Sequence, residues 1–366
     1  ENGTNGDQRI QDGYRLAMRS AHSLVKLENL DVIVEATGVP EVGAFVCEAA
    51  ILNHKHIVNM NVEADATIGY YLTQLADQHN VVYSLAAGDE PGSIKEIYDF
   101  ADALGFEIVA IGKGKNNPLN RASNPDTTAT KAERQKMSAK MLASFEDGTK
   151  TMVEMTSIAN AIGYPPDIRG AHGPNVNVNQ LADTFIPQTD GGIFSGAGKV
   201  DYAVGDVAPG VFVIITTDQP KIIRDLNYLR LNGNGKYWAF YRPYHLANLE
   251  TPITIANVVL DQRATLRQDR APVAETIATA KRDLVPGEKI DALGGYTVYG
   301  MIEKAEIVHR DGILPLGLAV GATIERPVKM GDPIRYDDVS LEATSNITRL
   351  RRKQDQLIGI QSSVSS

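Results

Sequence analysis

The sequence has a single cysteine, Cys47, and no run of about 18 apolar residues. One thiol permits no internal disulfide and no cysteine-rich zinc site, and it fits a reducing, cytoplasmic location. Without a long apolar run, we expect no helix that spans a membrane. Basic residues number 36 against 45 acidic ones, which leaves a net charge of −9. Nucleic-acid binding needs a basic surface that displaces counterions, so we expect no nucleic-acid partner.

The glycine-rich signature Gly-x-Gly-x-x-Gly, which cradles the pyrophosphate of a dinucleotide, is also absent. Glycines do cluster at Gly191-Gly192 and at Gly196-x-Gly198, but no predicted strand leads into a helix there. If the protein binds a dinucleotide, we therefore expect the phosphate-binding loop to lie upstream of Glu1.

A regular alternation of two patterns is present in the first part of the chain. Short apolar runs rich in β-branched residues predict strands at residues 31–35, 56–59 and 81–85. Apolar residues at three- and four-residue spacing predict helices at residues 14–27, 42–52, 67–78 and 94–104. Strands that alternate with helices favour parallel pairing through right-handed crossovers. The sequence thus predicts an α/β fold in which residues 1–92 form the carboxyl-terminal part of a doubly wound, Rossmann-like parallel sheet.

The remaining chain divides into two further predicted units. Residues 93–272 are expected to form an α+β domain for catalysis and dimerisation. Its predicted elements are strands at residues 106–111, 210–216 and 253–260, a polar loop at 113–130 and a helix at 132–145. Residues 273–366 are expected to form a small β-rich module, because residues 278–288 are echoed by residues 322–332, followed by a helix at 347–358. The echo predicts a separate folding unit that the chemistry does not require.

Small and polar residues follow each of the first three predicted strands. Ala36, Thr37 and Gly38 end the first strand, Asn59 and Asn61 end the second, and Gly88 follows the third. In doubly wound sheets, ligands bind at the carboxyl edge of the strands, so these residues are candidate cofactor contacts. Taken alone, a glycine in a strand-to-helix turn is commonplace, and an ordinary turn is the alternative.

Two adjacent acids, Asp89 and Glu90, precede Pro91 at a predicted helix start. Carboxylates at this position stabilise a helix by capping it and by opposing its dipole. The same pair could orient substrate hydroxyls or bind a divalent cation, Mg²⁺ or Mn²⁺, through oxygen ligands. The sequence leaves both interpretations open.

The segment Gly112-Lys-Gly-Lys-Asn-Asn-Pro118 is the most informative string in the chain. Its glycines would let the backbone approach an anion, and Lys113 and Lys115 would point to one side of an extended segment and supply charge. Asn116 and Asn117 are candidate substrate contacts, and Lys140 is a further one on the next helix. A solvated loop and a surface stripe of lysines are the alternatives.

The stretch Tyr241-Arg-Pro-Tyr-His-Leu246 gathers aromatic and titratable side chains. Arg242 is a candidate substrate contact, and His245 is a candidate catalytic group because histidine titrates near neutral pH. His172, in Ala171-His-Gly-Pro174, is a second histidine to which the same reasoning applies. A structural role is the alternative for each histidine.

These strings resemble a known superfamily. Residues 31–38, 56–61 and 111–118 are similar to the cofactor-domain end of homoserine dehydrogenases. Together with residues 86–91, 147–154 and 241–246, the chain looks closer to the 1-deoxy-D-xylulose 5-phosphate reductoisomerase-like branch. Its tail is similar to a SAF (antifreeze-like) module.

The resemblance implies an NADPH-dependent oxidoreductase of isoprenoid biosynthesis that forms a homodimer or homotetramer. Its substrate would be a small phosphorylated ketose or polyol, with Lys113, Lys115, Asp89, Glu90 and His245 as the catalytic group. Homoserine dehydrogenases carry a lysine directly after the asparagine that matches Asn61, whereas this chain has Val62. A homoserine-dehydrogenase-like amino-acid dehydrogenase is the first alternative, and a non-catalytic sugar-binding sensor or scaffold is the second.

Overall fold

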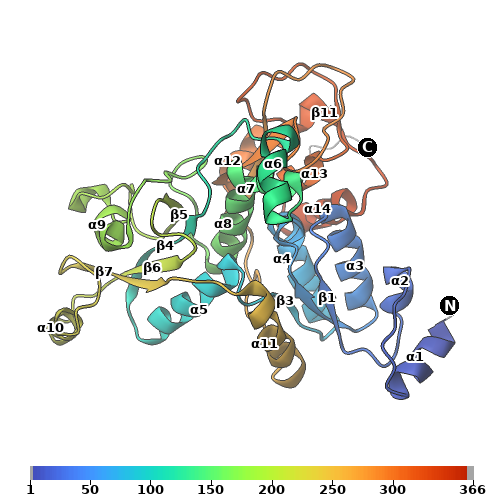
Figure 1. Ribbon diagram of the computed structural model, residues 1–366, viewed down its shortest axis with the longest axis horizontal. Coiled ribbons are helices and arrows are strands. Elements are labelled where there is room, and N and C mark those ends of the chain that lie inside the picture. Colours follow the sequence, from blue (N-terminus) through green and yellow to red (C-terminus); the bar gives the residue numbers. More distant parts are fainter. Residues whose placement is uncertain (1–2, 361–366) are drawn as a thin grey trace.

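A computed structural model describes residues 3–360 (Figure 1). Residues 1–2 and 361–366, at the ends of the first and third predicted units, lie outside the described residues. The first sheet contains β1 (Val32–Glu35), β2 (His56–Asn59) and β3 (Tyr83–Leu85) in the order β1-β2-β3, with both pairs parallel. The predicted α/β class with a parallel sheet is therefore confirmed.

Helices connect these strands in the predicted alternation. They are α3 (Pro40–Leu52), α4 (Val62–Gln78) and α5 (Glu90–Ala103). Helix α4 begins where Asn61 Oδ1 accepts a hydrogen bond from the backbone N–H of Ala64 at 3.1 Å, which is a standard N-cap. Between residues 3 and 27 the chain forms only α1 (Gly3–Gln11) and α2 (Ala21–Leu24), so the prediction of a helix over residues 14–27 is wrong over most of its length.

A further correction concerns residues 253–260, which lie in helix α11 (Ala247–Leu260) and not in a strand. Their β-branched composition imitates a buried strand. The buried positions of α11 are Thr251, Thr254 and Val258, and a spacing of three and four is that of one helix face. That face packs on the first sheet, where Val258 joins a cluster with Val58 and Val82.

The second sheet has the order β5-β4-β6-β7, with β4 parallel to β5 and antiparallel to β6. Its strands are β4 (Glu107–Lys115), β5 (Lys199–Val204), β6 (Val211–Thr216) and β7 (Tyr237–Arg242). Strand β4 runs four residues beyond the predicted strand, so part of the predicted loop is ordered in the middle of the sheet. The helices of this region are α6 (Pro125–Gln135), α7 (Ala139–Glu146), α8 (Thr149–Ile162), α9 (Leu181–Thr184) and α10 (Pro220–Tyr228). The single helix predicted at residues 132–145 is thus the end of α6 followed by α7.

The carboxyl-terminal segment packs against both earlier parts (Figure 1). It contains β8 (Ala274–Ala280), β9 (Val298–Lys304), α12 (Ala305–Asp311), α13 (Leu316–Ala319), β10 (Thr323–Ile324), β11 (Val339–Ser340) and α14 (Asn346–Leu357). Helix α14 lies on α3 and α4, and α8 lies against β8 and β9. One hydrophobic core runs from Val25 to Leu350, so it contains residues of all three predicted units. In the described part of the chain, every helix is too short or too polar to cross a membrane.

Candidate active site

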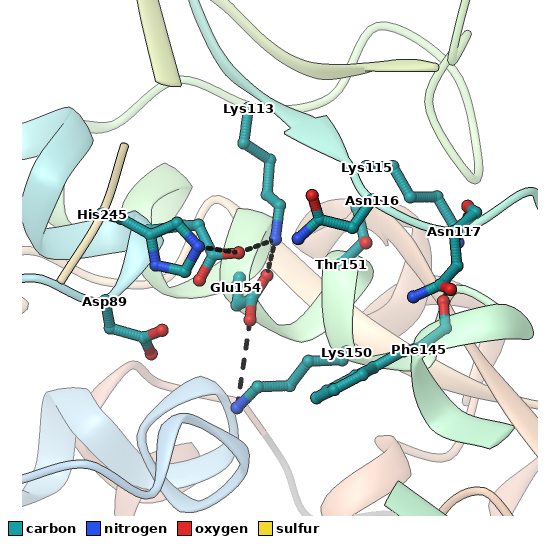
Figure 2. Close-up of a pocket in the computed structure, with 11 residues that line it drawn as sticks. Asp89, Lys113, Lys115, Asn116, Asn117, Phe145, Lys150, Thr151, Glu154 and His245 are labelled. Carbon is teal, nitrogen blue, oxygen red and sulfur yellow. Dashed lines mark hydrogen bonds and ion pairs between the residues drawn. The ribbon is translucent and has the colours of Figure 1, made fainter. Parts of the chain in front are cut away.

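A cavity of about 190 Å³ lies where the end of β4, the start of α5 and the first turns of α8 meet (Figure 2). The residues that line it come from these elements, from the end of α7, from the segment after β4 and from the loop before α11. They are Asp89, Glu90, Lys113, Lys115, Asn116, Asn117, Phe145, Lys150, Thr151, Glu154 and His245. All five predicted catalytic residues, and Asn116 and Asn117, therefore lie around one cavity.

The ammonium group of Lys113 is held between two carboxylates. Its Nζ lies 2.5 Å from Glu90 Oε1, and it also donates to Glu154 Oε2. The three side chains are 6%, 8% and 2% exposed, respectively. Burial disfavours the charged ammonium, but Glu154 and Glu90 outweigh it and raise the pKa of Lys113, which therefore stays protonated at neutral pH.

The two glutamates respond differently to this ammonium. Burial and the nearby charge of Glu90 raise the pKa of Glu154 to about 7, although Lys113 and Lys150 act in the opposite direction. Burial opposes ionisation of Glu90 as well, but Lys113, Asp89 and His245 together outweigh it and lower the pKa of that carboxyl. The cluster thus contains one fixed carboxylate and one that exchanges a proton near neutral pH.

Lys115 faces the same cavity from the same strand, two residues along, but has different partners. Its Nζ donates to two backbone carbonyls, Asn117 O at 2.6 Å and Phe145 O at 2.7 Å. Burial, together with the charge of Lys113, lowers the pKa of Lys115 to about 8. Each of these two ammonium groups thus keeps one N–H for a ligand, and their convergence on one anion stays a prediction.

The alternating glycines of this string serve packing. A Cβ on Gly112 would lie 2.4 Å from Asp201 O, and one on Gly114 would lie 2.2 Å from Ala208 N. The sequence suggested that the glycines let an anion approach the backbone. The structure corrects this, because neighbouring backbone fills that space.

Helix α8 supplies groups that sequence reasoning missed. Lys150 and Glu154 are four residues apart and share the face of α8 that looks into the cavity. Lys150 Nζ lies 3.3 Å from Glu63 Oε1 and 4.0 Å from Glu154 Oε1. The i, i+4 pairing of a lysine with a glutamate was the available signal, although it is common on solvated helices. Only the fold shows that this helix face is buried.

Asp89, Glu90 and His245 place three ligand atoms within 4.8 Å of one another. Two carboxylates and an imidazole fit Mn²⁺ better than Mg²⁺, which prefers oxygen ligands. Burial and the charge of Glu90 raise the pKa of Asp89 well above its usual range, and a cation would oppose the effect of that charge. Lys113 already contacts one oxygen of Glu90. The donor set therefore fits a divalent cation held chiefly by Asp89 and His245.

Three predicted residues lie away from this cavity. Arg242, at the end of β7, pairs with Glu96 at 2.5 Å and with Glu250. Lys140 is exposed on α7 and does not line the cavity. His172 lies 3.2 Å from Asp167 in a loop beside β5. The structure does not bring these side chains to the site.

The predicted cofactor contacts divide into two groups. Asn59 and Asn61 are fully buried, and their amides bond to Tyr83 and Val39. Asn59 and Asn61 are therefore structural, which corrects the prediction. A Cβ on Gly88 would lie 2.8 Å from the backbone of Leu246, so this glycine allows the close approach of the segment that carries His245.

The other group, Ala36, Thr37 and Gly38, forms an exposed turn at the carboxyl end of β1. A Cβ on Gly38 would meet no atom within 4 Å, so the space beside the turn is open. This turn lies two strands from the end of β3, about 10 Å at ordinary strand spacing. The open turn and the cavity therefore lie along one edge of the parallel sheet.

Comparison with known proteins finds a family model that is similar to the region of the cavity. Residues 88–251 match the family described as oxidoreductase DRL, catalytic domain. Every residue that lines the cavity lies inside this segment. The cavity is thus in the part of the chain that is similar to an oxidoreductase catalytic domain. No curated protein matches the chain.

Solved structures resemble the chain at low identity. A hyperthermophilic archaeal homoserine dehydrogenase in complex with NADPH is 12% identical over 70% of this chain and 82% of its own, with a TM-score of 0.39. An oxidoreductase from Bacillus cereus is 12% identical over 72% of this chain and 81% of its own, with a TM-score of 0.36. A homoserine dehydrogenase from S. aureus is 19% identical over 26% of this chain and 30% of its own, with a TM-score of 0.20. None of these likenesses assigns a substrate.

Proposed function

We propose that the protein is an NADP-dependent oxidoreductase that reduces a small phosphorylated ketose. The substrate would be 1-deoxy-D-xylulose 5-phosphate, which it would also isomerise, or a related phosphorylated polyol or ketose. One observation carries the proposal: a buried lysine ammonium, that of Lys113, is fixed by two carboxylates on the wall of a cavity. The similarity of residues 88–251 to an oxidoreductase catalytic domain supports the same conclusion.

The charges around the cavity favour an anionic substrate. Lys113, Lys115 and Lys150 bring three amino groups to its wall. Opposite them, Glu90 is ionised, Glu154 is partly protonated near neutral pH, and burial and Glu90 keep the pKa of Asp89 high. Even with Glu63 counted as the partner of Lys150, the site keeps a small excess of positive charge, which stabilises a phosphate and, in the transition state, a developing alkoxide.

Lys113 is the group we assign to the carbonyl oxygen. Two of its three N–H bonds go to Glu90 and Glu154, which leaves one for a ligand. Donation of this hydrogen bond polarises the carbonyl and stabilises the negative charge that develops on its oxygen. When Lys113 passes a proton to that oxygen, Glu154 is placed to return one, because its pKa of about 7 is matched to neutral pH.

Two bound groups would complete the chemistry. A nicotinamide dinucleotide supplies the hydride when bound, and the turn Ala36–Gly38 is the part of this chain that would contact it. A divalent cation, held by Asp89 and His245, would add Lewis acidity at the substrate oxygens. The residues themselves orient the substrate, exclude water and hold the proton.

An amino-acid dehydrogenase is the second candidate, and one observation favours it. Asp89 is a carboxyl on the cavity wall beside Glu90, and a substrate ammonium would restore its ionisation. In that reaction phosphate plays no part. Inhibition by inorganic phosphate therefore separates the two candidates.

The test is NADPH oxidation by the full gene product with a panel of phosphorylated ketoses and of amino-acid semialdehydes. We expect turnover with a phosphorylated ketose, competitive inhibition by inorganic phosphate, and a loss of about 100-fold or more in kcat/KM in Lys113→Met. Lys95→Met, which removes an exposed ion pair with Asp99 on α5, is the matched control and should turn over normally. Turnover of semialdehydes alone, unaffected by phosphate, would favour the second candidate.

A further inference from the structure

Lys281 lies just after β8 in the carboxyl-terminal segment. Its side chain reaches the turn between α7 and α8. The side chain is 4% exposed. Its Nζ donates three hydrogen bonds, to Ser123 O at 2.6 Å, Gly295 O at 2.8 Å and Asp147 Oδ2 at 2.9 Å. An ammonium group has three donors, so none is left for a substrate. Lys281 therefore cannot act on the reacting atoms directly.

Its partner Asp147 ties together the turn between α7 and α8. The Asp147 side chain is fully buried, and its second oxygen, Oδ1, accepts the backbone N–H of Thr149 at 2.8 Å. The carbonyl of Asp147 accepts a hydrogen bond from Arg121 at 2.6 Å. The carboxyl-terminal segment makes a second hydrogen bond to this turn. The N–H of Gly300, in β9, donates to Thr149 Oγ1 at 2.9 Å.

This turn presents two parts of the cavity wall. Phe145, two residues before Asp147, gives its carbonyl to the Lys115 ammonium. Lys150 and Thr151, just after Thr149, line the cavity themselves. A shift of the turn by about 1 Å would alter both parts, and misplacement on this order can cost about 100-fold in rate.

We infer that Lys281 is a positioning residue of the active site, which acts through Asp147 to hold the Phe145–Thr151 turn in register with Lys115. The carboxyl-terminal segment is then part of the catalytic apparatus, although none of its residues lines the cavity. A buried ion pair adds little net stability over a well-packed apolar pair. A purely structural contact would therefore be replaceable by apolar side chains, whereas positioning needs the directed hydrogen bonds.

The test compares Lys281→Met, the double variant Lys281→Met with Asp147→Asn, and Lys329→Met. The double variant removes both charges, so no unpaired carboxylate is buried, and its amide oxygen can still accept from Thr149. Lys329→Met removes an exposed ion pair, with Asp283, from the same segment and is the matched control. Each variant is read by hydrogen–deuterium exchange of residues 143–152 and by pH-dependent acetylation of Lys115, followed by peptide mass spectrometry.

In both Lys281 variants we expect the amide hydrogens of residues 143–152 to exchange faster. We also expect the pH at which Lys115 acetylation is half-maximal to rise toward that of an ordinary lysine. The control should match the parent protein. Unchanged exchange and acetylation in the folded double variant would overturn the inference. These readouts need no turnover, so they decide the inference even where the proposed function fails.

The kinetic consequence rests on the proposed function. In the double variant we expect kcat/KM for the ketose to fall by about 10- to 100-fold, while KM for NADPH stays within about twofold. A variant that melts at a lower temperature but keeps the parent kcat/KM would show a merely structural role and contradict the inference.

Discussion

The ammonium of Lys113 neutralises two buried carboxylates, so its removal affects stability as well as chemistry. In Lys113→Met, Glu90 would lose its ammonium partner, and Glu154 would keep only Lys150 at 4.0 Å. Breaking a buried ion pair in this way costs about 3–5 kcal/mol. We expect chemical denaturation to show a loss of that order, and Glu154→Gln added to Lys113→Met to recover part of it. Lys95→Met should change the unfolding free energy by less than about 1 kcal/mol. A Lys113→Met protein as stable as the parent would contradict the buried cluster.

Glu154 also gives a pH dependence whose sign is defined. Burial and Glu90 raise its pKa from 4.5 to about 7 in the folded protein. The folded state therefore binds a proton more tightly than the unfolded state, and the stability due to this group falls as the pH rises from 4.5 to 7. Urea denaturation should show that Glu154→Gln gains stability relative to the parent across this window. A parent–variant difference that stays constant from pH 5 to 8 would show that the pKa of Glu154 is not raised.

Strand β4 depends on its glycines because the neighbouring backbone lies against them. A Cβ on Gly114 would lie 2.2 Å from Ala208 N and 2.5 Å from Ala208 Cα. Backbone atoms cannot rotate away, so Gly114→Ala should destabilise the protein by about 1–3 kcal/mol or more. Gly196→Ala, where a Cβ meets nothing within 4 Å, is the control and should shift the thermal midpoint little. Equal midpoints for the two variants would contradict this packing.

Sequence patterns predict an element well when its apolar residues lie together in one short run. Strands β1, β2 and β3 are short apolar runs between helical segments, and their parallel order follows from the alternation alone. The pattern fails at residues 253–260, because β-branched residues on a helix with one buried face resemble a buried strand. It fails again at residues 112–115, where glycine and lysine suggest a loop but neighbouring backbone and carboxylates hold a strand.

The candidate site could be predicted only in part, for a related reason. Asp89, Glu90, Lys113 and His245 are unusual residue types at strand ends or in compact strings, so the sequence marks them. Glu154 looks like any helical glutamate, and its role depends on α8 lying behind β4. Asn59 and Asn61 look like ligands because they are polar and follow a strand, yet their side chains are bonded within the protein. The roles of these residues depend on contacts with residues that are distant in the sequence.

Taken as one molecule, the protein has a core that crosses all three predicted units. Arg351 of α14 is 2% exposed and pairs with Glu275 of β8 at 2.6 Å, while its Nη1 bonds to Thr67 O of α4 at 3.2 Å. Removal of residues 274–366 would expose α3, α4 and α8 together. We expect a chain that ends at Val273 to be insoluble or to lack a cooperative thermal transition. A soluble, cooperatively folding truncation would show that the carboxyl-terminal segment is a separate unit.

Central to the proposed function is that the protein reduces a carbonyl group, bound in the cavity around Lys113, with a hydride from a nicotinamide. The most direct measurement uses NADPH deuterated at the transferable position of its nicotinamide ring, the full gene product and a panel of phosphorylated ketoses. Mass spectrometry of the product then reports where the label goes. The account predicts one deuterium on the carbon that was the carbonyl, and none above background with Lys113→Met. Absence of label from the products of the parent protein, with either face of the ring deuterated, would contradict it.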